Sequence, residues 1–74
     1  MTPQELEASV MAHRYLYYVL AEPVLNDTVY DTIERQAREV CPPGSPVHGI
    51  GSSLPSSYTD EHVRLANFLR KKGE

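Results

Sequence analysis

Two aspartates on either side of a tyrosine stand out in the stretch NDTVYD, where Asp27 and Asp31 are four residues apart. On a helix this spacing puts both carboxylates on one face, where like charges destabilise an isolated helix by roughly 0.2–0.5 kcal/mol. If both lie in the first turn, the positive end of the helix dipole offsets the repulsion. Alternatively, the pair binds a cation. Tyr17, Tyr18 and Tyr30 favour this second interpretation, because aromatic faces beside carboxylates suit a flat cationic ring.

The first element that positions these residues is a helix predicted over residues 3–21. Its start is marked by TPQE at residues 2–5, which supplies a threonine N-cap, a proline at the first helical position and a glutamate that completes a capping box. Pro23 disfavours helical geometry in the residue before it, so the helix should end near residue 21 or 22. Residues of one helical face recur at spacings of four and three: Leu6, Val10, His13, Tyr17 and Leu20.

A second helix is predicted over residues 27–40, with Asn26 or Asp27 as its N-cap. The connection EPVLN is short, and short helix-to-helix turns usually join antiparallel neighbours. We therefore expect residues 1–41 to form an antiparallel helical hairpin with Leu25 near its bend. The apolar stripe predicted for the second helix consists of Val29, Ile33, Ala37 and Val40.

Residues 42–57 are rich in proline, glycine and serine, a composition that resists helix and strand and predicts a loop. A third short helix fits residues 59–72 within the segment 58–74, with Ser57 or Thr59 as its cap and Gly73 as its stop. Its predicted apolar face consists of His62, Leu65, Ala66 and Leu69. The sequence thus predicts one all-α domain over residues 1–74, a helical hairpin followed by a third short helix.

Size and charge exclude several classes of function. A chain of 74 residues with a net charge of −3 is one small domain, and its only cationic run is residues 70–72. We therefore expect no direct contact with nucleic acid, because a surface that follows phosphates needs several clustered cations. No apolar segment approaches the roughly 20 residues that cross a bilayer, and no signal peptide opens the chain. Together with the single Cys41, which has no partner for an internal disulfide, this predicts a cytoplasmic protein without membrane contact.

The remaining histidine, cysteine and tyrosine residues have ordinary structural explanations. The three histidines and Cys41 lack the paired short spacings of a zinc site, so we expect no bound metal. We expect His48 to be a solvated loop residue and Cys41 to be a buried thiol at a helix end rather than a nucleophile. Tyr15 and Tyr58 are expected at the edge of the core.

The stretch YLYYVLAEPVLNDTVYD, residues 15–31, followed by SPVHGIG, residues 45–51, resembles the N-terminal Ia domain of bacterial-type, NAD-dependent DNA ligases. The pattern of that family runs roughly YYxLDxPxxSDxEYD and then SPTxxVG. The tyrosine pair, the proline, the Asp-x-x-Tyr-Asp and the later Ser-Pro recur here in the same order. The resemblance covers about residues 5–51.

This resemblance implies a cofactor, a partner and a set of site residues. In that family the Ia domain closes over NAD bound to the adenylation domain and recognises its nicotinamide mononucleotide half. By resemblance, Tyr17 and Tyr30 sandwich the nicotinamide ring, and Asp27 and Asp31 engage its carboxamide, ribose or positive charge. The other residues that the resemblance assigns to the pocket are His13, Tyr18 and Leu25. The implied partner is the adenylation domain of a DNA ligase, in cis or in trans, with a part in DNA replication and repair.

Three departures from the family pattern concern the scaffold and not the implied pocket. Val29 replaces the usual acidic residue, Ala21 replaces an aspartate, and Val47 stands where threonine is usual. The adenylation motif Lys-x-Asp-Gly is absent, since Lys71 and Lys72 are the only lysines. No complete active site is therefore present on this chain. The favoured interpretation is a weak NAD-recognition module that is not catalytic alone. Two alternatives are a small interaction protein that docks on or inhibits a DNA ligase through the ligase-like hairpin, and a remnant without a present role.

Overall fold

The structure, a computed structural model, describes residues 2–22, 24–49, 54, 56 and 58–73. In these residues the chain forms three α-helices: α1 (Pro3–Arg14), α2 (Asp27–Val40) and α3 (Asp60–Gly73). A π-helical turn, η1 (Tyr15–Val19), continues α1, and a 3-10 turn, η2 (Pro46–His48), follows α2. No strand occurs among the described residues, so the all-α fold class is confirmed. The same part of the chain contains no helix that is both long and apolar enough to span a membrane.

The first two helices begin at the predicted caps. The Thr2 hydroxyl oxygen accepts from the Glu5 N–H at 3.1 Å, and a Glu5 carboxylate oxygen accepts from the Thr2 N–H at 3.1 Å. This is the complete capping box predicted from TPQE. The Asn26 side-chain oxygen accepts from the Val29 N–H at 2.9 Å. Asn26 and not Asp27 is therefore the N-cap of α2.

The third helix begins with a capping arrangement in which a histidine takes the usual place of glutamate. The Thr59 hydroxyl accepts from the His62 N–H at 3.2 Å, while the Thr59 N–H donates to Nδ1 of His62 at 3.3 Å. Two of the N–H groups that lack an intrahelical partner at this helix start are thereby satisfied. Of the two predicted caps, Thr59 is confirmed, and Ser57 lies outside the described residues.

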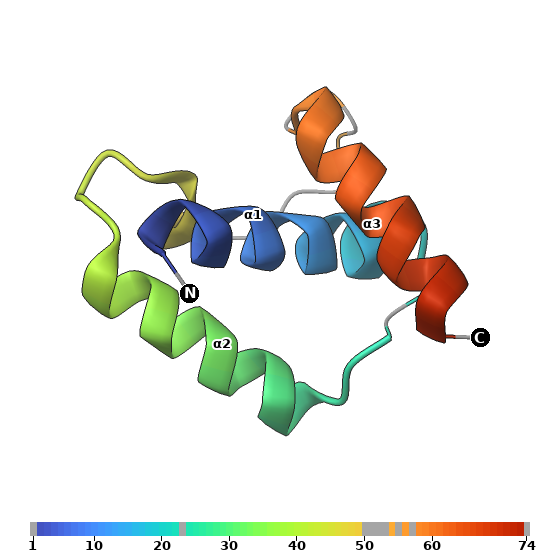
Figure 1. Cartoon of the computed structure of the whole chain (residues 1–74), viewed down its shortest axis with the longest axis horizontal. Coiled ribbons are helices and arrows are strands. Elements are labelled where there is room, and N and C mark those ends of the chain that lie inside the picture. The colour runs from blue at the N-terminus through green and yellow to red at the C-terminus, as the bar shows by residue number, and fades with distance from the viewer. Residues whose placement is uncertain (1, 23, 50–53, 55, 57, 74) are drawn as a thin grey trace.

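Helix α1 lies in the middle of the fold, with α2 antiparallel to it on one side and α3 crossing it on another (Figure 1). The core between α1, α2 and η2 contains Leu6, Val10, Ile33, Ala37, Cys41 and Val47. The core between α1, η1 and α3 contains Ala12, Tyr15, Leu16, Leu20, Val24, Leu65, Ala66 and Leu69. The helical hairpin is confirmed. The first helix, however, is buried on two faces, whereas the sequence predicted a single apolar stripe.

The stripe predicted for α2 is wrong at both ends. Val29 is 41% exposed and Val40 is 50% exposed, whereas Ala37 between them is fully buried. The face turned toward α1 is displaced around the helix, because Tyr30 and Glu34 reach across to hydrogen-bond with Arg14 of the first helix. A polar contact across the hairpin thus sets which face of α2 is covered.

The end of the first helix differs from a regular α-helix. The Leu20 N–H donates to the Tyr15 carbonyl at 3.1 Å, five residues back, which defines the wide π-helical turn. Ala21 then takes a left-handed conformation with φ of 54°, and the Glu22 N–H donates to the Leu16 carbonyl at 2.8 Å. The helical run therefore ends at Val19, two residues before the predicted end at residue 21. Tyr17, which the spacing pattern grouped with Leu6 and Val10 on one helical face, is 54% exposed, whereas Leu6 and Val10 are buried.

The loop predicted over residues 42–57 contains the short turn η2, which its composition did not indicate. The Ser45 hydroxyl accepts from the Val47 N–H at 3.4 Å and donates to a Glu7 carboxylate oxygen at 2.6 Å, which holds this turn against α1. Cys41 is a buried thiol that caps α2, as predicted. His48 is exposed, as predicted, and its ring lies 3.2 Å from the Cys41 carbonyl oxygen.

Candidate functional site

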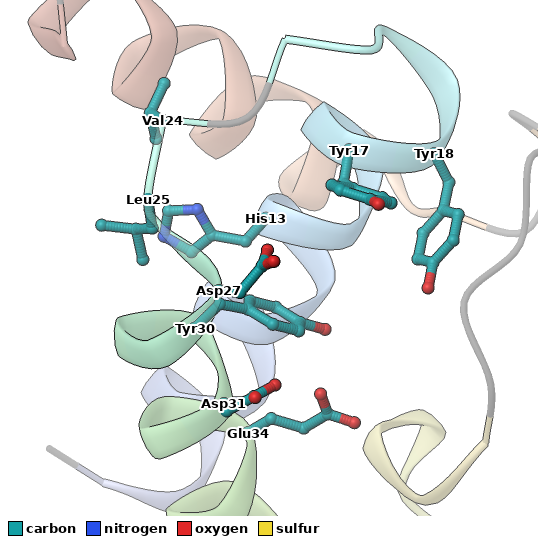
Figure 2. Close-up of a pocket in the computed structure, with 9 residues that line it drawn as sticks. All are labelled: His13, Tyr17, Tyr18, Val24, Leu25, Asp27, Tyr30, Asp31 and Glu34. Carbon is teal, nitrogen blue, oxygen red and sulfur yellow. The ribbon is translucent and has the colours of Figure 1, made fainter.

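A pocket of about 350 Å³ opens between the end of the first helix and the start of α2 (Figure 2). The structure brings together in it all seven residues that the resemblance assigned to the ligand, from two stretches of the chain, residues 13–18 and 25–31. These are His13, Tyr17, Tyr18, Leu25, Asp27, Tyr30 and Asp31. Val24 and Glu34 complete the lining, and neither was predicted. The hairpin turn is what makes the two helix ends neighbours.

Aromatic rings come to this pocket from both sides. Tyr17 and Tyr18 belong to η1 and contact each other edge to face, with ring centroids 4.9 Å apart and an angle of 73° between the planes. Tyr30 comes from α2, and Figure 2 shows its ring across the opening from the ring of Tyr17, with the Asp27 carboxylate at a level between them. Tyr17 and Tyr18 are both exposed. The arrangement can receive a flat ring between two aromatic faces.

The two aspartates do not share the same relation to the helix start. Since Asn26 is the N-cap, Asp27 is the first residue of α2, where the positive end of the helix dipole favours a carboxylate. Asp31 follows one turn later, beyond the first turn to which the dipole effect is largely confined. Both residues are exposed, and Glu34 adds a third carboxylate to the lining. The dipole therefore accounts for Asp27 and leaves Asp31 unexplained by helix stability.

Arg14 is the main residue near the pocket that the sequence analysis missed. It is only 2% exposed, and each nitrogen of its guanidinium group has a hydrogen-bond partner. Nε donates to the Tyr30 hydroxyl at 3.1 Å, and Nη2 donates to Oε1 of Glu34 at 3.0 Å. Nη1 and Nη2 also donate to the carbonyls of Pro46 and Val47, each at 3.0 Å. One side chain thus joins α1, α2 and η2.

These contacts change the pKa values of the residues involved. Burial alone raises the pKa of the Glu34 carboxyl, but the hydrogen bonds and charges of Arg38 and Arg14 outweigh it, so the net pKa is lowered. Burial likewise raises the pKa of the Tyr30 phenol, and the hydrogen bond and charge of Arg14 offset only part of that rise. At neutral pH the pocket therefore has a charged Glu34 and a neutral Tyr30.

His13 lines the pocket and is only 8% exposed. Burial lowers the pKa of its imidazole, so the ring is neutral at neutral pH. A neutral imidazole has one nitrogen that donates and one that accepts a hydrogen bond, and it does not repel a cationic ligand. The pocket therefore combines three carboxylates with a histidine that adds no positive charge.

Of Glu34 and Arg14, neither of which was predicted, only Glu34 had a local indication in the sequence. Glu34 and Arg38 are four apart on α2, a spacing that favours an ion pair, and the Arg38 Nη2 lies 2.7 Å from Glu34 Oε1. Arg14 offered no such local signal, because the oxygen atoms to which it donates belong to residues 16 to 33 positions away in the chain. Among the described residues, no three histidine, cysteine, aspartate or glutamate side chains are placed so that they could hold one metal ion.

Comparison with known proteins gives one family and a consistent set of relatives. Residues 2–51 match the DNA ligase-like, N-terminal NAD+-binding domain family. The chain is 36% identical over 82 residues to a DNA ligase of Roseiflexus castenholzii, covering 95% of the chain and 11% of the ligase. It is 36% and 38% identical over 62 residues to DNA ligases of Petrotoga mobilis and Porphyromonas gingivalis, covering 74% of the chain and 9% of each ligase. It spans about a tenth of the length of these relatives. No solved structure matches the chain at a comparable significance.

Proposed function

Because the chain belongs to the family of DNA ligase-like, N-terminal NAD+-binding domains, we propose that its pocket receives the nicotinamide mononucleotide half of NAD+. NAD+ is the cofactor of this domain family. The observation that supports the assignment to this pocket is its combination of two opposed tyrosine rings with three carboxylates. Tyr17 and Tyr30 stack on the nicotinamide ring, while Asp27 and Asp31 favour its positive charge.

The oxidised cofactor fits this charge pattern better than the reduced one. Oxidised nicotinamide is flat and carries a positive ring charge, so both the cation–π attraction and the carboxylates favour it. The reduced ring is neutral and loses both contributions. The pocket is open to water, which weakens its electrostatic attraction, so we expect a dissociation constant on the order of a millimolar or weaker for the mononucleotide alone.

The proposed role is recognition and not catalysis by this chain alone. The sequence has no Lys-x-Asp-Gly nucleophile, so AMP transfer requires an adenylation domain, in cis or in trans. We propose that the chain covers NAD+ on such a domain in the cytoplasm and thereby serves DNA replication and repair. Added to a ligase that lacks its own N-terminal domain, the chain should restore adenylation. Inhibition of an intact ligase by the same chain would instead favour the alternative of a ligase-docking inhibitor.

An NMR titration of the chain tests the assignment of the pocket. Oxidised nicotinamide mononucleotide should shift the resonances of Tyr17, Asp27, Tyr30 and Asp31, while the reduced form and the nicotinic acid analogue should shift them less. Asp31→Ala should remove most of this preference. The matched control is Asp60→Ala, which removes an exposed carboxylate from the start of α3, outside the pocket. Equal responses to the oxidised and reduced forms would refute the charge argument.

Stability of the Asp31 variant separates the two explanations of the aspartate pair. If Asp31 is placed for a ligand and only repels Asp27 in the free chain, Asp31→Ala should leave stability unchanged or raise it by a few tenths of a kcal/mol, roughly 0.2–0.5. Urea unfolding measures this difference. A clear loss of stability would show that Asp31 helps to hold the helix and would favour the dipole interpretation.

A further inference from the structure

The ring of Tyr30 is held in place from outside the pocket. Tyr30 and Glu34 line the pocket, whereas Arg14, which donates to both of them, lies behind them and is not part of the lining. The Tyr30 hydroxyl accepts from Nε of Arg14 at 3.1 Å. Since the backbone of α2 fixes the other end of this side chain, the hydrogen bond leaves the ring little freedom to turn.

The guanidinium group is itself fixed by the main chain of η2. Nη1 donates to the Pro46 carbonyl and Nη2 to the Val47 carbonyl, each at 3.0 Å. This turn is held against α1 through the hydrogen bond from Ser45 to Glu7 and by Val47, which is fully buried. A planar group bound to two carbonyls on one side presents its remaining N–H groups in fixed directions on the other. The position of Tyr30 is therefore determined by a turn that does not reach the pocket.

This matters for a flat ligand because stacking depends on the plane of the aromatic ring. Tyr17, the ring across the pocket, is 54% exposed, and no hydrogen bond of its hydroxyl is found among the described residues. Tyr30 is half-buried and anchored at its hydroxyl. Of the two rings, Tyr30 is thus the fixed wall against which a ligand is placed.

We propose that Arg14 is a positioning residue, which sets the plane of the Tyr30 ring and the direction of the Glu34 carboxylate without touching the ligand. The ligand part of this inference rests on the proposed function of the pocket. Arg14 acts through its geometry as well as its charge, because a lysine cannot reproduce five N–H groups in one plane.

Tyr30→Phe is the first test, because it keeps the stacking ring and removes only the hydroxyl that Arg14 binds. The probe is oxidised nicotinamide mononucleotide, followed by NMR. Tyr30→Phe should weaken binding by about threefold to tenfold, the range expected from one lost hydrogen bond. The control Tyr15→Phe removes a hydroxyl from a tyrosine of the same hairpin that packs on Tyr58 outside the pocket, and should change affinity by less than about twofold. Unchanged affinity in Tyr30→Phe would overturn the proposal.

A double-mutant cycle distinguishes positioning from a general structural effect. Arg14→Lys keeps the charge but loses the planar group, and should weaken binding about as much as Tyr30→Phe does. If Arg14 acts through Tyr30, adding Tyr30→Phe to Arg14→Lys should weaken binding by less than about twofold more. Fully additive losses would overturn the proposal. If Arg14→Lys does not fold, the difference in ligand affinity between Tyr30→Phe and Tyr15→Phe still tests whether the hydrogen bond from Arg14 to Tyr30 supports binding.

A ligand-free measurement separates this inference from the proposed function. In the free chain the Arg14 Nε–H should give a slowly exchanging NMR signal with a nuclear Overhauser effect to the Tyr30 ring protons, and Tyr30→Phe should shift that signal. Absence of the Overhauser effect would overturn the anchoring of Tyr30, whatever the ligand does. Its presence, together with no response of the chain to the mononucleotide, would support the anchoring and refute the proposed ligand.

Discussion

Replacing Arg14 with methionine tests how much of the stability of this fold depends on one buried guanidinium group. The variant Arg14→Met keeps much of the length of the side chain and removes every N–H group, so Tyr30, Glu34 and the two carbonyls of η2 lose a donor. Removing one partner of a buried ion pair costs roughly 3–5 kcal/mol. Glu34 is 19% exposed and keeps Arg38, so we expect a loss near the lower end, about 3 kcal/mol.

The size of this loss relative to the total stability of the fold determines how much stability the variant keeps. At roughly 0.05–0.15 kcal/mol per residue, 74 residues give a total stability of about 4–11 kcal/mol. Arg14→Met should therefore remove between a quarter and most of the stability. The matched control is Arg38→Met, whose side chain is 46% exposed although its 2.7 Å contact reaches the same Glu34 oxygen. An exposed ion pair of this kind contributes about 0.5 kcal/mol or less. Losing the shorter contact of Arg38 should therefore cost less stability than losing the longer but buried contact of Arg14.

Urea unfolding followed by far-ultraviolet circular dichroism measures both losses, with an unchanged slope showing that only stability has changed. Repeating the comparison at acid pH provides a check on mechanism. The folded-state pKa of Glu34 is lowered, so the stability from its charge is present above the ordinary value of 4.5 and is lost as the pH falls through the folded pKa. At acid pH the difference in free energy of unfolding between Arg14→Met and the parent should therefore become smaller. Equal losses in Arg14→Met and Arg38→Met would refute the argument that burial decides.

Two further predictions concern the helix ends. Burial lowers the pKa of His62 against the opposing charges of Glu7 and Glu61, so the stability from its neutral ring is present above pH 6.5 and is lost as the pH falls through the lowered folded value. His62→Gln keeps an acceptor for the Thr59 N–H and should flatten the acid side of a curve of stability against pH. An unchanged curve would show that the titration of His62 does not cause the loss of stability. Ala21→Gly should raise stability by about 0.5–1 kcal/mol in thermal unfolding, because glycine adopts a φ of 54° without strain. A lowered midpoint would show that Ala21 is not strained.

Local signals in the sequence predicted the helix starts well, because each depends on a few consecutive residues. Thr2, Asn26 and Thr59 are caps through hydrogen bonds that reach only three residues ahead. The family resemblance likewise placed seven residues that the hairpin gathers around one pocket. Whether those residues contact NAD+ stays a prediction.

The features that the sequence did not predict depend on contacts between distant segments. The face of α2 turned toward α1 follows from Arg14, whose partners are chosen by the packing of three elements and not by spacing along one. The π-helical turn at Tyr15–Val19 has an apolar and aromatic composition that also suits a regular helix. Periodicity alone groups Tyr17 with the buried Leu6 and Val10 on one helical face and does not show that Tyr17 itself is exposed.

The central place of α1 gives the two walls of the pocket separate support. The wall with Tyr17 belongs to η1, which packs in the core shared with α3, whereas the wall with Tyr30 belongs to α2 and the core shared with η2. Local opening of a protein occurs in cooperative units that follow such cores. Amide hydrogens of η1 should therefore exchange together with those of α3, and those around Tyr30 with α2. One side of the pocket can thus loosen to admit a ligand while the anchored side keeps its shape.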